Sequence, residues 1–200
     1  GQLTIINPYF TGHSMRSRNR LSPEARRHQL VETAIETFAE MGIERTGHGD
    51  IAKRAGVSTA TVFNYFPTRE ALTQDVLNEI EAHVVEMFKT LPDTCGGAKE
   101  QILSMSVAYE KMIEDRPATL KAYLSWSVSF NPDLRPQYLA TRGHILDLMK
   151  SIMPAPLNNE TDALIVYNAA NMMAIMKFDK TPREVMAKFT LRLIDALLAA

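Results

Sequence analysis

Apolar residues recur every three or four positions along most of the chain, which is the spacing of one face of a helix. The longest such stripe spans residues 68–91 and consists of Leu72, Val76, Ile80, Val84, Met87 and Leu91. At 1.5 Å per residue this helix is about 35 Å long, enough to join two parts of a molecule. No segment alternates apolar and polar residues as a half-buried strand does. The pattern therefore predicts an all-α fold.

Prolines and glycines divide the rest of the pattern into shorter helices. Ser22 and Pro23 are suited to begin the first helix, and Gly42 to end it. Residues 1–14 show no periodicity, and Met15 is an alternative first residue of the natural chain. After residue 92, proline-containing breaks predict helices at about 99–114, 117–130, 134–153, 160–177 and 182–198.

Residues 50–66 predict two short helices that cross at a tight corner. Gly56 stands where the chain must reverse, and a positive φ there costs glycine nothing. Ser58 is a suitable N-cap for the second helix, and Pro67 ends it. The apolar positions that would join the two helices are Ile51, Ala52, Ala55, Val57, Val62 and Phe66. The pattern indicates a helix-turn-helix; the alternative is an αα corner inside some other helical protein.

The second of these helices is built from weak helix formers, which favours a helix held by its neighbours to present a surface. Recognition helices read base edges with their N-terminal residues. Asn64, Tyr65, Thr68 and Arg69 are placed to reach phosphates, although Arg69 as a solvated charge is the alternative. At the start of the preceding helix, Thr46 and His48 are also placed to contact a phosphate, through a side chain or a backbone amide. The first-turn residues that we expect at base edges are Thr59, Ala60 and Thr61, and the cap residue Ser58 is expected to belong to the same DNA-binding surface.

The distribution of charge agrees with a DNA-binding N-terminal part. The net charge is −1, yet residues 1–69 carry nine Lys/Arg against six Asp/Glu, whereas residues 70–200 carry thirteen against seventeen. Arg16, Arg18 and Arg20 form an extended basic arm that we expect in a minor groove or along phosphates. The alternative for this arm is a solvated basic tail.

The run GHGDIAKRAGVSTATVFNYFPTREAL, residues 47–72, resembles the DNA-binding domain of the TetR family. Within it, ATVFNYFPTRE at 60–70 resembles the LuxR/HapR branch, which comprises quorum-sensing master regulators, as does LSWSVSF at 124–130. The chain differs from the branch pattern at Thr46, Gly49, Thr59 and Ser125, which leaves the operator sequence and the polarity of the pocket open.

This resemblance implies a TetR-like organisation. A basic arm (1–20) would precede a three-helix DNA-binding head with the helix-turn-helix (21–67). A connecting helix (68–91) would lead to a larger helical ligand-binding and dimerisation domain (92–200). The resemblance also implies a homodimer on a pseudo-palindromic double-stranded DNA operator.

The last two helices are apolar on more than one side, whereas a surface helix needs one apolar face. The second face predicts a two-fold dimer through a four-helix bundle; the alternative is a pair of central helices in a monomer. The residues expected at this interface are Tyr167, Met173, Met176, Met186, Phe189, Leu193 and Leu197.

Between the connecting helix and these terminal helices, apolar residues with a few polar groups indicate a pocket for a small apolar ligand. Methionine also fills ordinary cores, which is the alternative for each methionine here. A ligand would act by moving the connecting helix. The expected lining is Met105, Tyr109, Met112, Tyr123, Trp126, Ser129, Asn171 and Met172.

Other classes of protein lack support in the sequence. We find no phosphate loop, nucleophile motif or paired carboxylates, so we expect no enzyme and no cofactor. The histidines at 13, 28, 48, 83 and 144 have no ligand spacing among themselves, so we expect no metal site. No apolar run reaches the length of about 18 residues that would indicate a membrane-spanning helix. The single cysteine, Cys95, cannot form a disulfide within the chain, so we expect a cytoplasmic protein; a redox-sensing role for this thiol is the alternative.

The sequence thus predicts a dimeric, sequence-specific transcriptional regulator of the LuxR/HapR type. One alternative is a ligand-responsive TetR repressor outside that branch, for example of efflux or catabolic genes. The other is an architectural DNA binder of low specificity.

Overall fold

The computed structural model describes residues 21–91 and 97–199, and every regular element in these residues is helical. The predicted all-α fold is confirmed. The arm residues Arg16, Arg18 and Arg20 and the lone Cys95 lie outside the described residues. The elements are α1 (Pro23–Met41), the 3-10 turn η1 (Ile43–Arg45), α2 (His48–Ala55), α3 (Thr59–Tyr65), α4 (Arg69–Lys89), α5 (Ala98–Asp115), α6 (Pro117–Ser127), α7 (Arg135–Ile152), α8 (Glu160–Phe178) and α9 (Arg183–Leu198).

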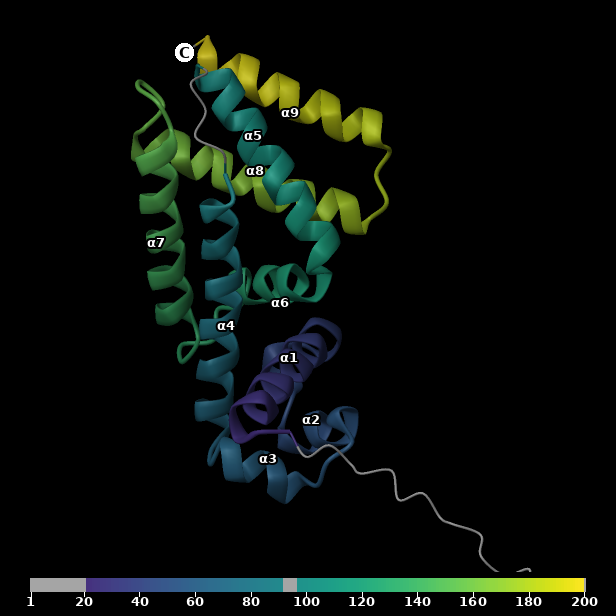
Figure 1. Cartoon of the computed structure of the whole chain (residues 1–200). Coiled ribbons are helices and arrows are strands. Elements are labelled where there is room, and N and C mark those ends of the chain that lie inside the picture. Colours follow the sequence, from purple (N-terminus) through teal and green to yellow (C-terminus); the bar gives the residue numbers. More distant parts are fainter. Residues whose placement is uncertain (1–20, 92–96, 200) are drawn as a thin grey trace, which may run out of the picture.

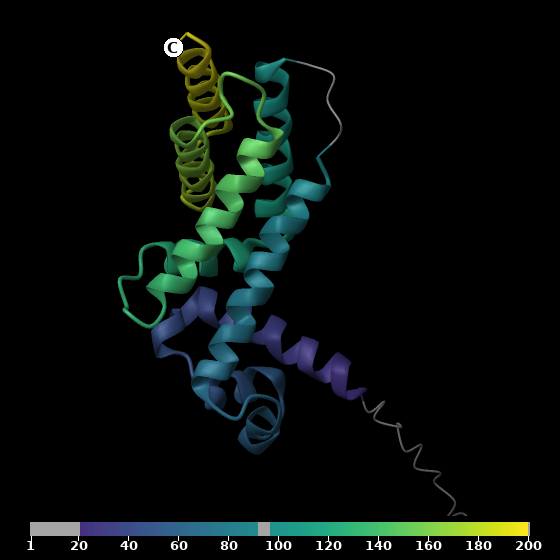
Figure 2. The ribbon, with the colours of Figure 1, turned by 90° about the vertical axis from the view of Figure 1, so that its left-hand side faces the viewer.

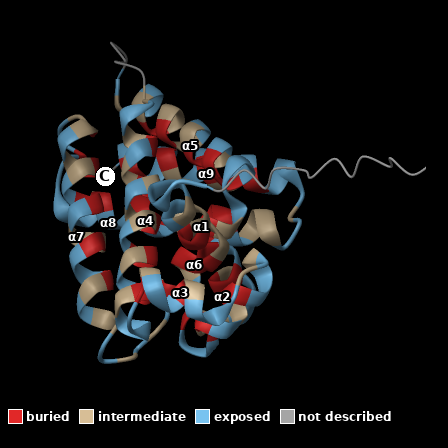
Figure 3. Cartoon of the chain, turned by 60° about the horizontal axis from the view of Figure 1, so that its bottom comes forward, coloured by how far each residue is buried: buried red, intermediate tan, exposed pale blue. Residues whose placement is uncertain are grey.

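The helices form a small head and a larger body. Figure 1 shows α1, α2 and α3 together at one end, with α4 rising from the head into the body beside α7. Helix α6 lies across the bottom of the body and packs on α1. Figure 3 shows the buried residues gathered where α1, α4 and α6 face one another, while the outer faces of α2 and α3 are exposed. The head is therefore attached to the body through α4 and through the contact of α1 with α6.

The helix-turn-helix corner forms as the sequence predicts. Gly56 has φ 66° and ψ 34°, the left-handed conformation, and its amide donates to the carbonyls of Ala52 and Lys53. The Ser58 hydroxyl then caps α3 by accepting from the Thr61 amide at 3.1 Å. Val62 and Phe66 are fully buried against α2 and α1, so α3 is held by its inner face.

Helix α4 joins the two parts. The Thr68 hydroxyl caps it by accepting from the Ala71 amide at 3.1 Å, and the helix continues for 21 residues. Its predicted stripe is buried along the whole length, from Leu72 in the head to Met87 in the body. A change in the direction of α4 would consequently alter its packing in both the head and the body.

The body differs from the prediction at one helix end. Helix α6 stops at Ser127 instead of residue 130, and the Ser129 amide closes a turn on the Trp126 carbonyl. Asn131 precedes a proline, a position that disfavours helical backbone, so the chain turns before it. Figure 2 shows α8 and α9 together at one side of the body.

Among the described residues, no helix has the length and apolar character needed to cross a membrane.

Candidate nucleic-acid interface and ligand cavity

The first turn of α3 presents small side chains at the end of the head. Thr59 and Ala60 are exposed, and Thr61 is half-buried because its hydroxyl lies 2.8 Å from that of Ser58. The structure therefore brings the cap residue Ser58 together with the three residues that the sequence predicts at base edges. Nothing bulky in this turn keeps the backbone away from a groove.

The second turn of α3 places three further predicted residues beside this surface. Asn64 is exposed, and Tyr65 is half-buried against the head core. Thr68 is exposed, with its hydroxyl accepting the capping hydrogen bond at the start of α4. These side chains border the first turn of α3 and form the rim of the candidate interface.

The expectation that the His48 side chain contacts a phosphate is wrong. His48 is only 7% exposed, and its Nε2 atom donates to the Phe66 carbonyl at 2.7 Å. Its ring stacks on Phe63 with centroids 4.0 Å apart and 6° between the planes. His48 therefore joins α2 to α3 and positions the interface from within.

The side chain of Thr46 needs the same correction, whereas that of Arg69 is exposed but bonded to the protein backbone. Thr46 is 2% exposed, and its hydroxyl donates to the Gly42 carbonyl at 2.9 Å. The Arg69 guanidinium donates to the carbonyls of Ile43 at 3.0 Å, Glu44 at 2.6 Å and Thr46 at 3.3 Å. Arg69 therefore binds the carbonyl end of η1 to the start of α4, a long-range contact that a position in a first turn does not reveal.

Two other arginines of the head have partners within the protein. Arg27 forms an ion pair with Asp75, donates to the Tyr65 carbonyl at 3.0 Å and lies over the Phe66 ring. Arg54 bridges α2 to Glu36 and Glu40 of α1, and its hydrogen bond lowers the pKa of the Glu40 carboxyl. The sequence analysis missed both residues, which fix α2 and α3 against their neighbours.

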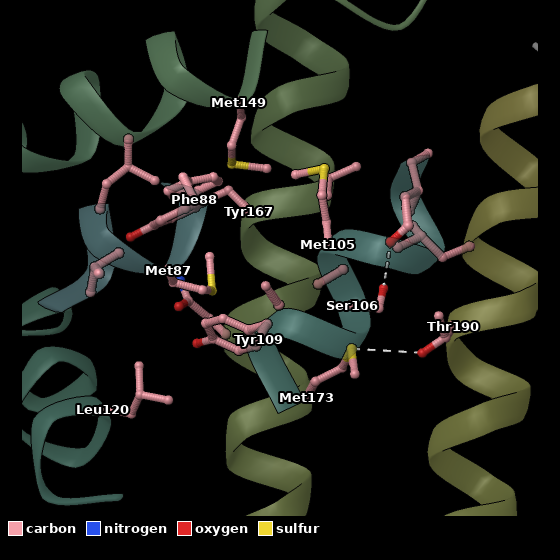
Figure 4. A pocket seen from close by; sticks show the side chains of 18 of the residues that line it. Met87, Phe88, Met105, Ser106, Tyr109, Leu120, Met149, Tyr167, Met173 and Thr190 are labelled. Atoms are coloured by element: carbon pink, nitrogen blue, oxygen red, sulfur yellow. Dashed lines mark hydrogen bonds between the residues drawn. The ribbon is translucent and has the colours of Figure 1, made fainter. Parts of the chain in front are cut away.

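A small cavity of about 60 Å³ lies in the body, lined by residues of α4, α5, α6, α7, α8 and α9. Of the eight residues predicted to line it, Met105, Tyr109, Tyr123 and Asn171 do so. Figure 4 shows Met105, Tyr109 and Met173 around the space, with the Thr190 hydroxyl donating to the Met173 sulfur at 3.6 Å. The lining is almost wholly apolar, which suits an apolar ligand.

The other four predicted residues do not line this cavity. Met112 is buried in the core, and Trp126 is fully buried with its indole N–H donating to the Leu134 carbonyl at 3.2 Å. Ser129 donates to the Glu44 carboxylate at 2.9 Å and so contacts the head. Met172 is 45% exposed on the outer side of α8. Sequence position alone did not show which way these side chains point.

Three tyrosines, Tyr109, Tyr123 and Tyr167, are among the polar residues that line the cavity, and Tyr138 lies behind them. The Tyr167 hydroxyl lies 2.8 Å from that of Tyr123 and 2.9 Å from that of Tyr138, and burial raises the pKa of Tyr123 and Tyr138. Tyr109 is different: within the described chain its buried hydroxyl has no hydrogen-bond partner. Burial also raises the pKa of Tyr109, so the hydroxyl stays neutral and able to donate.

The predicted interface residues of α8 and α9 are largely used inside the protomer. Tyr167, Met173, Met186 and Leu197 are buried, and Leu193 lines the cavity, which corrects their assignment to a subunit contact. Met176 and Phe189 are half-buried. The large apolar residues exposed on these helices are instead Leu164, Ile165, Met172 and Ile175 on α8 and Val185, Leu191 and Leu198 on α9.

Comparison with known proteins agrees with this geometry. The profile of the family "Bacterial regulatory proteins, tetR family" matches residues 30–76, which span most of α1 to the first third of α4. The HTH-type transcriptional regulator LuxR of Vibrio harveyi is 44% identical over 130 residues, which cover 63% of this chain and 62% of LuxR. The HTH-type transcriptional repressor KstR2 of Mycolicibacterium smegmatis is 27% identical over 101 residues, covering 50% and 49%.

Solved structures share the fold over a longer part of the chain. A TetR-like transcriptional regulator from Rhodococcus sp. RHA1 superimposes with a TM-score of 0.73 at 16% identity, covering 90% of this chain and all of that one. The chain is thus similar to TetR-family regulators in the sequence of its head and in its fold. The matched regions nevertheless span less than two thirds of these two curated relatives.

Proposed function

We propose that the protein is a homodimeric, sequence-specific transcriptional regulator that places α3 of each protomer in a major groove of its operator. The observation that carries this proposal is the exposed first turn of α3, made of small residues and held from within by Val62 and Phe66. Two protomers related by a two-fold axis would read a pseudo-palindromic site with half-sites about 34 Å apart.

Within this proposal the contacts divide by type. Thr59, Ala60 and Thr61 face base edges, while Ser58, Asn64, Tyr65 and Thr68 reach phosphates. The arm residues Arg16, Arg18 and Arg20 follow the adjacent minor groove or the backbone. Side chains this small read few base edges directly, so the shape of the DNA contributes to specificity.

The dimer would form through the exposed apolar residues of α8 and α9. These residues lie on the same two helices that the sequence predicts, but on their outward sides. Packing the outward sides of two protomers together makes a four-helix bundle and removes this apolar surface from water. The partners of the protein are then a second copy of the chain and double-stranded DNA.

Control by a small apolar ligand would use the cavity of the body. Val84, Met87 and Phe88 of α4 line the cavity, and the other end of α4 belongs to the head. A volume of about 60 Å³ is well below the usual size of a ligand site. A larger ligand would therefore push α4 and its neighbours apart. It would bind the dimer more tightly in the conformation with one spacing between the two heads than in the conformation with another spacing.

The similarity to LuxR favours a regulator of the quorum-sensing branch. The apolar cavity favours the second candidate, a ligand-responsive TetR repressor outside that branch. An architectural DNA binder fits less well, because its affinity rests on many phosphate contacts, and the head arginines Arg27, Arg54 and Arg69 are engaged within the protein.

Selection of binding sites from a random pool of duplex DNA tests the proposal. A regulator should enrich a two-fold symmetric site and bind it about 10³-fold or more tightly than random DNA. Ala60→Asp adds a negative charge to the exposed turn of α3 and should abolish this binding. Ala140→Asp makes the same change on an exposed part of α7 and should leave it intact. No enrichment, or equal binding by both variants, would contradict the proposal.

A further inference from the structure

A cluster of histidine and glutamate side chains lies between α1 and α4, away from the face of α3 and from the cavity. His28 and Glu32 are one helical turn apart on α1, and Glu79 and His83 are one turn apart on α4. Residues four apart lie on one face of a helix, so each helix directs one imidazole and one carboxylate toward the other. This is an arrangement that binds a metal ion between two helices.

The distances show how closely the four groups approach. Nε2 of His83 lies 3.2 Å from Oε1 of Glu79 and 3.5 Å from Oε1 of Glu32. One ligand atom each of His28, Glu32 and Glu79 lies within 4.8 Å of the other two. One imidazole nitrogen and two carboxylate oxygens thus lie close together, and His83 borders both carboxylates.

The cluster contains acceptors that lack donors. The Glu32 Oε1 atom is buried and, in the part of the chain that the structure describes, accepts no hydrogen bond. The His83 side chain is 9% exposed, and its Nδ1 atom lies 3.2 Å from the Thr119 hydroxyl. Arg116 Nη1 lies 2.9 Å from Nε2 and 3.4 Å from Nδ1 of the same ring, so a cation already occupies the side of His83 that faces the two carboxylates.

We propose that His28, Glu32, Glu79 and His83 form a binding site for a divalent transition metal ion, for which Zn²⁺ is the best match. Zinc takes four nitrogen and oxygen ligands at about 2.0–2.2 Å in a tetrahedron, whose ligand atoms are then about 3.3–3.5 Å apart. The two distances from His83 Nε2 agree with such edges. The Thr119 hydroxyl would orient the His83 ring, as the outer partners of metal-bound histidines do.

The Arg116 guanidinium would leave when the metal ion binds. Its Nη1 atom lies 2.9 Å from His83 Nε2 and 3.9 Å from Glu32 Oε1, so it is a cation facing the same acceptors. The side chain is 47% exposed and can turn into solvent. Two carboxylates balance the charge of Zn²⁺ once the guanidinium has moved away. Binding would replace the contact of Arg116, just before α6, with a direct link between α1 and α4.

No metal site is expected from the sequence, because the histidines have no ligand spacing among themselves. The signal was present as two histidine–glutamate pairs at a spacing of four. It becomes informative when the fold brings α1 against α4, since each pair alone is ordinary on a helix surface.

The test is titration of the full chain, without a histidine tag, with Zn²⁺ in competition with a chromophoric chelator. All variants carry Cys95→Ser, which removes the single thiol of the chain as a competing ligand. We expect one Zn²⁺ per chain and a rise of the unfolding temperature on binding. His28→Ala, at an exposed position, should weaken binding by about 10- to 100-fold without affecting the fold. Glu79→Gln should weaken it to a similar extent.

Two further variants make the test specific. His144→Ala is the matched control, because its Nδ1 atom lies 3.0 Å from Glu81 Oε1 in a different histidine–glutamate pair of α4, and it should leave the affinity unchanged. Arg116→Ala should tighten binding by about three- to tenfold, because it removes the competing cation. Absence of stoichiometric binding would overturn the proposal. So would equal affinities of the wild type and His28→Ala, or an equal loss in His144→Ala.

Discussion

The Nε2 atom of His48 lies 2.7 Å from the backbone oxygen of Phe66, and this hydrogen bond joins the first residue of α2 to the residue that ends α3. Helix α3 has only seven residues, too few for a helix to be stable alone. The proposed DNA-reading surface thus depends on side chains that hold α3 from behind.

Replacing His48 with alanine should destabilise the head. The variant leaves the Phe66 carbonyl without its donor and removes the ring stacked on Phe63, so we expect a loss of about 1–3 kcal/mol in the free energy of unfolding. Urea unfolding followed by circular dichroism measures this loss. Asn64→Ala is the control on the exposed side of α3 and should change stability by less than about 0.5 kcal/mol. An unfolding free energy for His48→Ala equal to that of the wild type would show that the bond does not support the head.

Arg69→Ala separates the two roles considered for this residue. Since the guanidinium donates to three carbonyls of the preceding turn, its loss should lower the free energy of unfolding by about 1–3 kcal/mol. The slope of log K against log salt concentration for operator binding should stay the same. If Arg69 neutralised a phosphate, the slope would instead fall by about 0.9, and the structural assignment would be refuted.

Two tyrosine-to-phenylalanine substitutions in the cavity should have unequal effects. Tyr167→Phe removes the hydroxyl shared by Tyr123 and Tyr138 and should cost about 1–3 kcal/mol. Tyr109→Phe removes a buried hydroxyl that has no partner among the described residues, so it should leave stability unchanged or raise it by up to about 1 kcal/mol. Thermal and urea unfolding of the ligand-free protein check both values. A large loss from Tyr109→Phe would mean that its hydroxyl has a stabilising partner.

The proposed dimer depends on the outward side of α8. Ile175→Glu places a charge within the exposed apolar surface, and burying that charge should raise the dimer dissociation constant by about 100-fold or more. Val107→Glu is the control, because Val107 is 67% exposed but belongs to α5 and not to either helix of the proposed interface. Sedimentation velocity at several concentrations distinguishes the two variants. If Val107→Glu dissociated the dimer and Ile175→Glu did not, the interface would not lie on the outward side of α8.

Local signals in the sequence were sufficient for the helix-turn-helix. Gly56 and Ser58 act through partners within five residues, so their roles follow from neighbouring positions alone. The partners of His48 and Arg69 were not predicted because they lie 18 to 26 residues away in the chain. A polar side chain at a helix start looks the same in sequence whether it faces DNA or a distant carbonyl.

The body was harder to predict for a related reason. Helix α8 is apolar on nearly every side, and the sequence does not show which side the protomer itself covers. The structure buries Tyr167 and Met173 and exposes Met172 and Ile175. The choice is made by the packing of α5 and α7 on α8, which are long-range contacts. Helix existence and approximate ends were therefore predictable, while the direction of individual side chains was not.

The most direct test of the central claim is protection of guanine N7 from dimethyl sulfate on the selected operator, since N7 lies in the major groove. The account predicts two protected groups related by two-fold symmetry and about one helical turn apart, both lost with Ala60→Asp. Protection at a single position, or protection that persists in Ala60→Asp, would contradict the placement of two α3 helices in successive major grooves.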